Sequence, residues 1–253
     1  MTDTPRPPRP MWQIVLGLVA GVLMVLIAAP LLMPNRAAAP APTARSGATL
    51  LPWQTELRPG GGLGVFGLQL GGDGASSLDD AQALWPSEVL KVALLTGRDG
   101  SLAVEGYLES IQVGGLQGKL VLAVVVEPAT LAAWAQRATG AEFKPSGARQ
   151  AHLDHNDLTE ARRQPLAALA FLPAARLDEA TVVQRFGPNP QRIETTDGAL
   201  HLLYPARGVA ITLDPKGQDR PVLQYVAPTE FQRRLLAPLQ AAAAASAPAS
   251  GAH

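Results

Sequence analysis

The chain has 253 residues, 47% of them hydrophobic, and its 21 basic side chains balance 21 acidic ones. Residues 1–49 hold four of the basic residues and one acidic residue, so the remainder has a net charge of −3 and lacks the basic footprint of a nucleic-acid-binding protein. The chain has no cysteine, which excludes disulfides, thiolate metal sites and a lipid anchor attached to a cysteine.

Residues 11–33 form an apolar run without Asp, Glu, Lys or Arg. About 20 apolar residues cross the hydrocarbon core of a bilayer as a helix, so this run predicts one transmembrane helix. Arg6 and Arg9 precede it, which favours a cytoplasmic segment at residues 1–10 and export of the rest. The alternative is a signal peptide cleaved near residues 37–39, although the run is longer than the roughly 7–15 residues of such a peptide's apolar core.

Gly17 and Gly21 lie about one turn apart on this predicted helix. Small residues at this spacing let two membrane helices approach closely, so the pair is a candidate for self-association. Residues 34–60 are rich in Ala, Pro and Gly and predict an extended spacer. Residues 241–253 predict a disordered tail.

Residues 61–139 predict a first unit of helix and antiparallel strands. Ser77 followed by Asp80 is typical of a helix start, and apolar residues at helical spacing extend this helix as far as Pro86. Pro128 opens a second short helix. Between the two helices, strands are predicted over residues 89–95, 102–113 and 119–126.

Residues 140–152 are polar and contain glycine, so they are predicted to be a linker. Residues 153–240 predict a second unit, which begins with a helix capped by Asp154 or Asn156. An apolar helical turn is expected over residues 166–172. The earlier order then recurs, with a helix over 177–186, strands over 192–196, 199–204, 209–213 and 222–226, and a last helix opened by Pro228.

Short segments of the two units match at an almost constant offset. Residues 78–81 (LDDA) correspond to residues 177–180 (LDEA), and residues 126–130 (VEPAT) correspond to residues 226–230 (VAPTE). Two matches at nearly one offset indicate an internal duplication. Chance is the alternative, because Leu, Ala and acidic residues are common.

The glycine-containing segment at 67–72 before LDDAQALWP, and the segment LDEATVVQRFGPNPQRI before a hairpin, carry a resemblance to a known fold. The order of elements over about residues 61–240 resembles the tandem α/β units of the β-lactamase-inhibitor-protein fold and of the SmpA/OmlA-type envelope lipoproteins. The lipoprotein cysteine is missing and a predicted membrane helix replaces it, which puts an outer-membrane role in doubt. The resemblance implies a non-catalytic binding module in the cell envelope.

Three histidines are the first candidates for chemistry. His152 and His155 have the i, i+3 spacing of metal ligands on a helix, but no third ligand is evident and solvated histidines near a helix start are common. His201 falls in a predicted strand whose alternation places its side chain on the solvent face, where it is a candidate for a catalytic base.

The remaining candidates are glycines and carboxylates. The glycine-rich residues 60–67 lack both the Lys-Ser/Thr pair and the strand-to-helix context of a phosphate loop. Glu105, Glu109 and Glu127 are typical of solvated strand faces, although paired carboxylates also serve acid–base catalysis. We therefore predict no catalytic, cofactor-binding or metal-ligating residue.

Aromatic residues are few, and they indicate core or interaction positions. Trp85 and Phe186 occupy matching helix ends and are predicted to be core residues. Tyr204 and Arg207 border a predicted turn, and these residue types are favoured at binding surfaces, so they are candidate interaction residues. A strand end followed by a turn explains the same residues without a partner.

The sequence as a whole predicts a single-pass inner-membrane protein whose C-terminal region lies in the periplasm and binds another envelope protein. The Ala- and Pro-rich, Lys-poor composition indicates a bacterial source with GC-rich DNA. The partner would dock on a sheet face or a strand edge, and the paired glycines predict a homodimer. No cofactor and no nucleic acid are expected. The alternative is an extracytoplasmic enzyme or small-ligand-binding protein with a site between the two units, which a filled apolar seam would contradict.

Overall fold

The computed structural model describes residues 51–143, 147–195, 197–217 and 219–245. The predicted membrane helix with Gly17 and Gly21 lies outside the described residues, as do residues 1–10, most of the predicted spacer and residues 246–253. Within the described ranges, no helix is long and apolar enough to cross a membrane.

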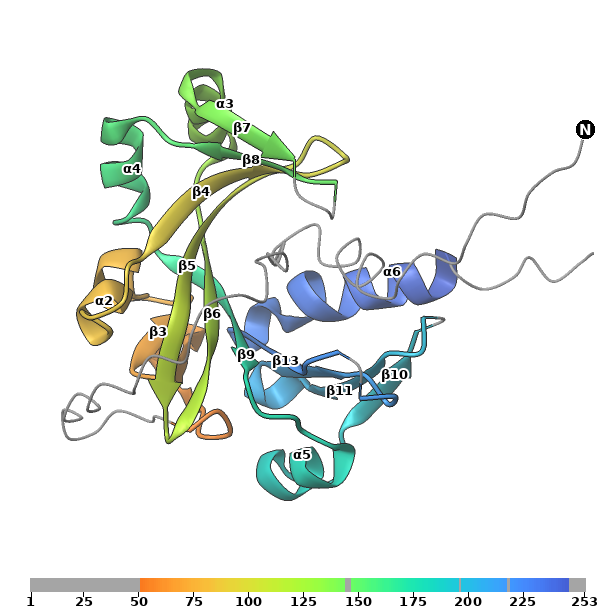
Figure 1. Cartoon of the computed structure of the whole chain (residues 1–253). Helices are drawn as coiled ribbons and strands as arrows, with labels where there is room; N and C mark the ends of the chain where they lie inside the picture. Colours follow the sequence, from red (N-terminus) through yellow and green to blue (C-terminus); the bar gives the residue numbers. More distant parts are fainter. Residues whose placement is uncertain (1–50, 144–146, 196, 218, 246–253) are drawn as a thin grey trace, which may run out of the picture.

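The fold is α+β, as predicted, and is built on a ten-stranded antiparallel sheet (Figure 1). The strand order is β10-β11-β12-β13-β9-β6-β5-β4-β8-β7, so β6 and β9 meet at the centre while β10 and β7 form the edges. The strands are β4 (Lys91–Thr96), β5 (Leu102–Val113), β6 (Leu116–Val124), β7 (Thr139–Phe143), β8 (Arg149–His152), β9 (Leu166–Pro173), β10 (Gln191–Glu194), β11 (Leu200–Tyr204), β12 (Val209–Leu213) and β13 (Val222–Val226).

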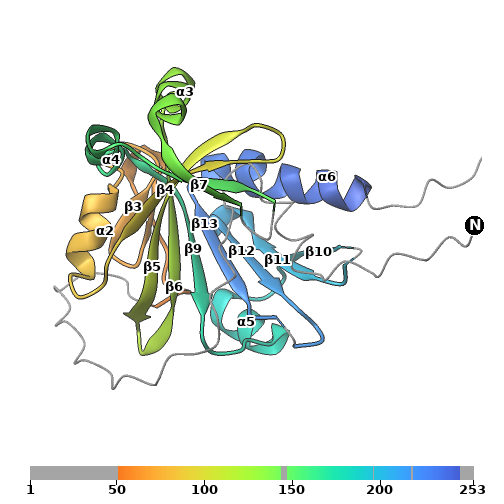
Figure 2. The ribbon, with the colours of Figure 1, turned by 45° about the horizontal axis from the view of Figure 1, so that its top comes forward.

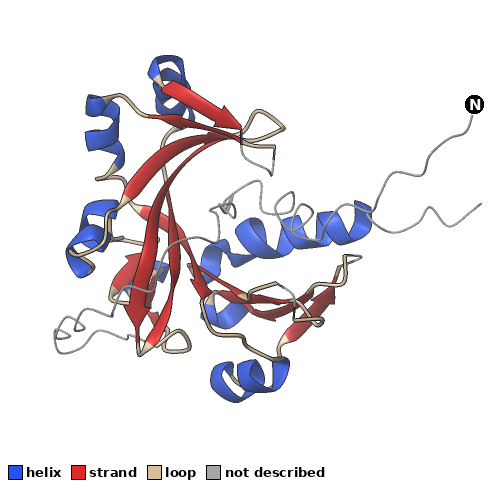
Figure 3. Ribbon diagram, viewed as in Figure 1, coloured by secondary structure: helices blue, strands red, loops and turns tan. Residues whose placement is uncertain are grey.

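A three-stranded sheet and several short helices surround the large sheet (Figure 3). The small sheet comprises β1 (Glu56–Leu57), β2 (Leu63–Val65) and β3 (Leu68–Leu70). The α-helices are α2 (Leu78–Leu84), α3 (Pro128–Arg137), α4 (His155–Ala161), α5 (Glu179–Phe186) and α6 (Ala237–Ala245). Shorter helical segments are η1 (Pro59–Gly61), η2 (Pro205–Arg207), η3 (Pro228–Glu230) and η4 (Gln232–Leu236).

Local signals in the sequence place several elements correctly. The Ser77 hydroxyl accepts a hydrogen bond from the Asp80 amide (3.2 Å), and the Asp80 carboxylate accepts one from the Ser77 amide (2.8 Å), which is a complete capping box for α2. Asp154 caps α4 by accepting a hydrogen bond from the Asn156 amide. The strands β5, β12 and β13 have the predicted bounds.

The predicted linker at residues 140–152 is wrong, because this stretch contributes to β7 and β8, which extend the sheet beyond β4. All five residues of β7 are exposed, and Gly140 has a φ of +64° where the pairing of β7 with β8 is irregular. An exposed edge strand with a bulge does not show the apolar alternation by which strands are recognised. The polar composition therefore resembles that of a connection.

Three other boundaries differ from the prediction. Residues 166–172, expected to be a helical turn, belong to β9, a central strand that is buried along its whole length. A short apolar run looks the same whether it is a strand or a helix buried on all sides. The predicted spacer ends early, since Pro52 is buried and β1 begins at Glu56. The predicted tail begins late, since α6 continues to Ala245.

The large sheet buries apolar side chains on both faces. On one face, α2, α5 and the small sheet cover Leu108 and Tyr225, and both Trp85 and Phe186 lie in this core, as predicted. On the other face, the segment from Phe231 to Leu239 covers residues of β6, β9 and β12. A third cluster forms beneath α3 and α4 around Trp134, which is 1% exposed.

The two halves of the chain join along a filled apolar seam. In the pairing of β6 with β9, Leu120 lies opposite Phe171 and Leu122 lies opposite Leu169, and none of these four side chains is accessible to solvent. The central part of the junction between the predicted units therefore has no room for a ligand. Any opening must lie at one end of this seam.

Candidate functional site

The first residues described in the structure lie across the end of α5 and are fixed there by hydrogen bonds. The Tyr225 hydroxyl, from the second half of β13, donates to the Pro52 carbonyl oxygen (2.9 Å). The Arg207 guanidinium donates to the carbonyl oxygens of Trp53 and Phe186. Residues 51–54, which we call the strap, are therefore attached both to the sheet and to the C-terminal end of α5.

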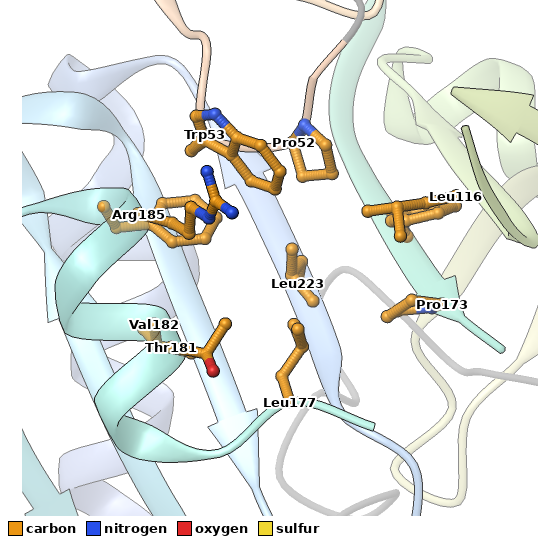
Figure 4. A pocket seen from close by; sticks show the side chains of 11 residues that line it. Pro52, Trp53, Leu116, Pro173, Leu177, Thr181, Val182, Arg185 and Leu223 are labelled. Atoms are coloured by element: carbon orange, nitrogen blue, oxygen red, sulfur yellow. The ribbon is translucent and has the colours of Figure 1, made fainter. Parts of the chain in front are cut away.

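A recess opens between the strap and α5, at the end of the β6–β9 seam (Figure 4). The Arg185 guanidinium stacks on the Trp53 ring, 4.9 Å from the ring centroid, and forms one side of the recess. The space measures about 290 Å³ when the solvent at its mouth is included. Its lining is formed by Pro52, Trp53, Leu116, Phe171, Pro173, Leu177, Thr181, Val182, Arg185, Phe186 and Leu223.

The lining determines what this recess, called the Trp53 recess below, can bind. Its walls are aliphatic, proline and aromatic side chains, while Thr181 and Arg185 supply the polar groups. Much of this volume is open solvent, so the Trp53 recess is a shallow depression and not an enclosed pocket like those of about 300–1,000 Å³ that hold drug-sized ligands and cofactors. Its apolar surface can pack against an apolar side chain of another protein, and the exposed Arg185 can attract a carboxylate next to it.

The two candidate interaction residues lie beside the Trp53 recess but bind within the chain. Tyr204 is buried, its hydroxyl donates to the Gly187 carbonyl oxygen (3.0 Å), and burial raises the pKa of this phenol. Arg207 is half-buried and holds the strap. These contacts give both residues a structural role, and their contact with a partner remains a prediction.

His201 is buried, so its predicted solvent-facing orientation is wrong. Its Nδ1 lies 3.0 Å from the Thr212 hydroxyl and its Nε2 lies 3.3 Å from the Thr195 hydroxyl, which in turn donates to Asp197 (2.5 Å). Burial lowers the pKa of His201 from 6.5 to about 4, although the charge of Asp197 acts in the opposite direction. A neutral, fully bonded imidazole in this position stabilises the β11–β12 hairpin.

The other candidates for chemistry are dispersed. His152 ends β8 and His155 begins α4, both exposed, and the described residues contain no group of three or more metal-binding side chains. Glu105 is buried in β5, whereas Glu109 forms an ion pair with Lys119 (2.7 Å). That pair lowers the pKa of Glu109 against the opposing effect of burial.

The glycine-rich residues 60–67 form η1 and β2 and lead into the small sheet. Phe66, within this stretch, is fully buried and packs edge-on against Phe171 (5.4 Å) and Tyr225 (5.6 Å). This stretch is therefore part of the core.

The residues that line the Trp53 recess were missed by the sequence analysis. Trp53 and Arg185 are separated by more than 130 positions, and nothing local indicates that they meet. The one available signal was the Pro52-Trp53 pair itself, because a tryptophan within the predicted Ala- and Pro-rich spacer has no amphipathic element of its own to pack against.

Comparison of the chain with protein-family models, with curated proteins and with solved structures gives no match. The function must therefore be argued from the site and from the sequence pattern.

Proposed function

We propose that this chain is a membrane-anchored protein of the bacterial cell envelope that binds a partner protein in the periplasm through the Trp53 recess. The observation that carries this proposal is the apolar surface of the shallow recess between the strap and α5. Aromatic and arginine side chains dominate the binding energy of protein interfaces, and Trp53 and Arg185 are stacked at its edge. The expected ligand is an apolar side chain of the partner next to an acidic residue.

The membrane anchor is supported by the charge-free run at residues 11–33 and by the weak excess of basic residues before it. Its test is the intact mass of the protein recovered from alkali-washed membranes. A full-length mass in the membrane pellet is expected. A mass that lacks about the first 39 residues, found in the soluble fraction, would contradict the anchor.

The filled seam between β6 and β9 counts against the alternative of a small-ligand site between the two units, which leaves only the Trp53 recess at its end, lined by Leu116 from the first predicted unit and by Leu223 from the second. Small-ligand sites combine an apolar wall with several convergent polar groups. The lining holds two polar side chains, Thr181 and Arg185, but the surface exposed within the recess is apolar, so such convergent polar groups are absent from it. Protein binding is therefore the better supported of the two functions.

Site-specific photocrosslinking tests the interaction. A photoreactive amino acid at Thr181, which lines the Trp53 recess, is expected to trap one envelope protein in the native host. The matched control is Gln184, an exposed residue of the same helix that does not line the recess. Arg185→Ala, combined with the Thr181 probe, should weaken the adduct. Equal adducts from both positions would overturn the proposed site, and so would their absence from Thr181.

The two halves also fit a duplication, in keeping with the resemblance to tandem α/β envelope modules. When the two halves are aligned with an offset of about 100 sequence positions, β4 corresponds to β10 and β6 overlaps β13. The corresponding helices α2 and α5 cover the same face of the sheet. The long strand β5 corresponds to the β11–β12 hairpin. Its pairing with β6 is irregular between Leu108 and Ile111, which is near the position of the η2 turn in the second half.

A further inference from the structure

The strand β10 is the regular edge of the large sheet. It pairs with β11 without a bulge, whereas the opposite edge strand β7 is irregular. Figure 2 shows β10 at the outer end of the sheet, and no described strand pairs with its outer side. Gln191, Arg192 and Glu194 are exposed, and Ile193 is half-buried. An edge of this kind is a template for another strand.

The hairpin that follows β10 determines which backbone groups point outward. The Thr195 amide donates to the Ala199 carbonyl oxygen (3.0 Å), so these two residues form a hydrogen-bonded pair. In an antiparallel ladder such pairs alternate with pairs that are not hydrogen-bonded. Ile193 therefore directs its amide and carbonyl toward β11, and Arg192 and Glu194 direct theirs toward the free edge.

We propose that β10 pairs with β10 of a second copy of this chain, antiparallel and centred on Ile193. A two-fold axis perpendicular to the sheet gives antiparallel strands. In this register Arg192 of each copy lies opposite Glu194 of the other, and both residues have outward-pointing backbone groups. The contact therefore forms four backbone hydrogen bonds and two cross-strand pairs of opposite charge.

The neighbouring registers are less favourable. Centring on Arg192 places two guanidinium groups opposite each other, and centring on Glu194 does the same with two carboxylates. Like charges directly opposite destabilise strand pairing. A shift by one residue places the outward-pointing backbone groups of Arg192 and Glu194 opposite residues whose own amide and carbonyl point toward β11. The outward-pointing groups would then have no hydrogen-bond partners. The order Arg-Ile-Glu is thus complementary to itself in a single register.

Both faces of the strand fit this arrangement. Ile193 packs beside the core covered by η4 and α6, and the second Ile193 would lie directly across the axis and extend this core. On the opposite face, Arg192 forms an ion pair with Glu179 of α5. A guanidinium has five N–H donors, so Arg192 can keep this contact and also bind Glu194 of the second copy.

Cysteine trapping tests the register, because the chain has no cysteine of its own. Residues opposite each other in a non-hydrogen-bonded pair have Cα atoms about 4.5 Å apart, within the range of a disulfide. Full-length I193C in native membranes, treated with a mild oxidant, is expected to form a disulfide-linked dimer. V89C, whose parent side chain is 73% exposed on the loop before β4, is the control and should remain monomeric.

Charge-reversed variants distinguish disulfide formation through this contact from disulfide formation by random collision or by association through the predicted membrane segment. E194R or R192E, each combined with I193C, places like charges opposite each other twice and should slow trapping about tenfold. Mixing the two variants, distinguished by their tags, restores both opposite-charge pairs and should restore a mixed dimer. Trapping of I193C no better than V89C, or insensitive to the charge variants, would overturn the proposal.

Ile193 contacts the core, so thermal unfolding of I193C is recorded first. Should the cysteine variant fail to fold, E194R and R192E without the cysteine are compared by sedimentation of the full-length protein in detergent. Each alone should lower the dimer fraction and the mixture should recover it; an unchanged fraction refutes the pairing. The outcome is independent of the Trp53 recess, which is tested through Thr181.

Discussion

Stability should fall between pH 7 and pH 5 because of a single buried imidazole. The pKa of His201 in the folded chain is about 4, against 6.5 for a free imidazole. The unfolded chain therefore binds more protons than the folded chain in this interval, and stability decreases as the pH falls from 6.5 toward 4. The two pKa values give a loss of about 2 kcal/mol between pH 7 and pH 5.

The perturbation is His201→Gln, which keeps hydrogen-bonding groups near Thr212 and Thr195 but cannot take up a proton. The assay is urea unfolding of the full-length protein in detergent at pH 7, 6 and 5. The unsubstituted chain should lose about 2 kcal/mol across the series and the variant much less. Carboxylates with lowered pKa values, such as Glu109 and Glu230, act in the same direction at low pH but are common to both proteins.

Parallel pH profiles for the two proteins would refute this account. They would mean that His201 takes up its proton in the folded state near its ordinary pKa, which is incompatible with a buried imidazole held between two hydroxyl groups.

Three further changes test the fold. Ser77→Ala removes the N-cap of α2 and should cost about 1 kcal/mol in thermal unfolding, and no loss would contradict the capping box. Gly208→Ala should lower the free energy of unfolding by roughly 2–4 kcal/mol, because the added Cβ would lie 2.0 Å from the Val226 carbonyl oxygen and because Gly208 has a φ of +64°. A melting temperature equal to that of the unsubstituted chain would contradict this packing. Arg207→Met removes the hydrogen bond to the Trp53 carbonyl oxygen and should release the strap. Trypsin should then cut after Arg58 faster than in the unsubstituted chain, while the remainder stays folded. An unchanged cleavage rate would show that Arg207 does not hold the strap.

Local signals account for the elements that the sequence predicted well. Ser77 and Asp80 define a helix start through atoms only three residues apart, and the glycine pair after Val113 ends β5. The strand β12 is buried along its whole length, and it was recognised because turn residues at Gly208 and at 214–217 mark both of its ends. These elements need no knowledge of the rest of the chain.

The errors concern elements whose character depends on their place in the sheet. The strand β9 is buried on both faces, so its apolar run carries no period that distinguishes it from a buried helix. The strands β7 and β8 lie at the edge, where exposure removes the apolar pattern. The sequence thus predicted strands that turn residues bound, and it missed an apolar strand that follows a helix and two polar strands at the exposed edge.

The candidate site was beyond local prediction for a different reason. The strap, Arg207 and α5 meet only when β13 is in place, because Tyr225 and Arg207 bind carbonyl oxygens of Pro52 and Trp53 that are distant in sequence. The candidates Tyr204 and Arg207 were near the site because strand ends collect polar and aromatic residues. Their partners could not be deduced without the sheet order.

The charge pattern of β10 shows what the structure adds to such a sequence. Arg192 and Glu194 flank Ile193, and in a sequence this is an ordinary solvated strand face. The Thr195–Ala199 hydrogen bond establishes that the two charged residues also carry the outward-pointing backbone groups. Had the hairpin been one residue longer or shorter, Ile193 would direct its amide outward, and the hydrogen bonds at the axis would join the two Ile193 residues instead of Arg192 and Glu194. The turn therefore determines which opposite pairs are hydrogen-bonded, and the order Arg-Ile-Glu determines the register, which is why swapping the charges on separate chains is its most direct test.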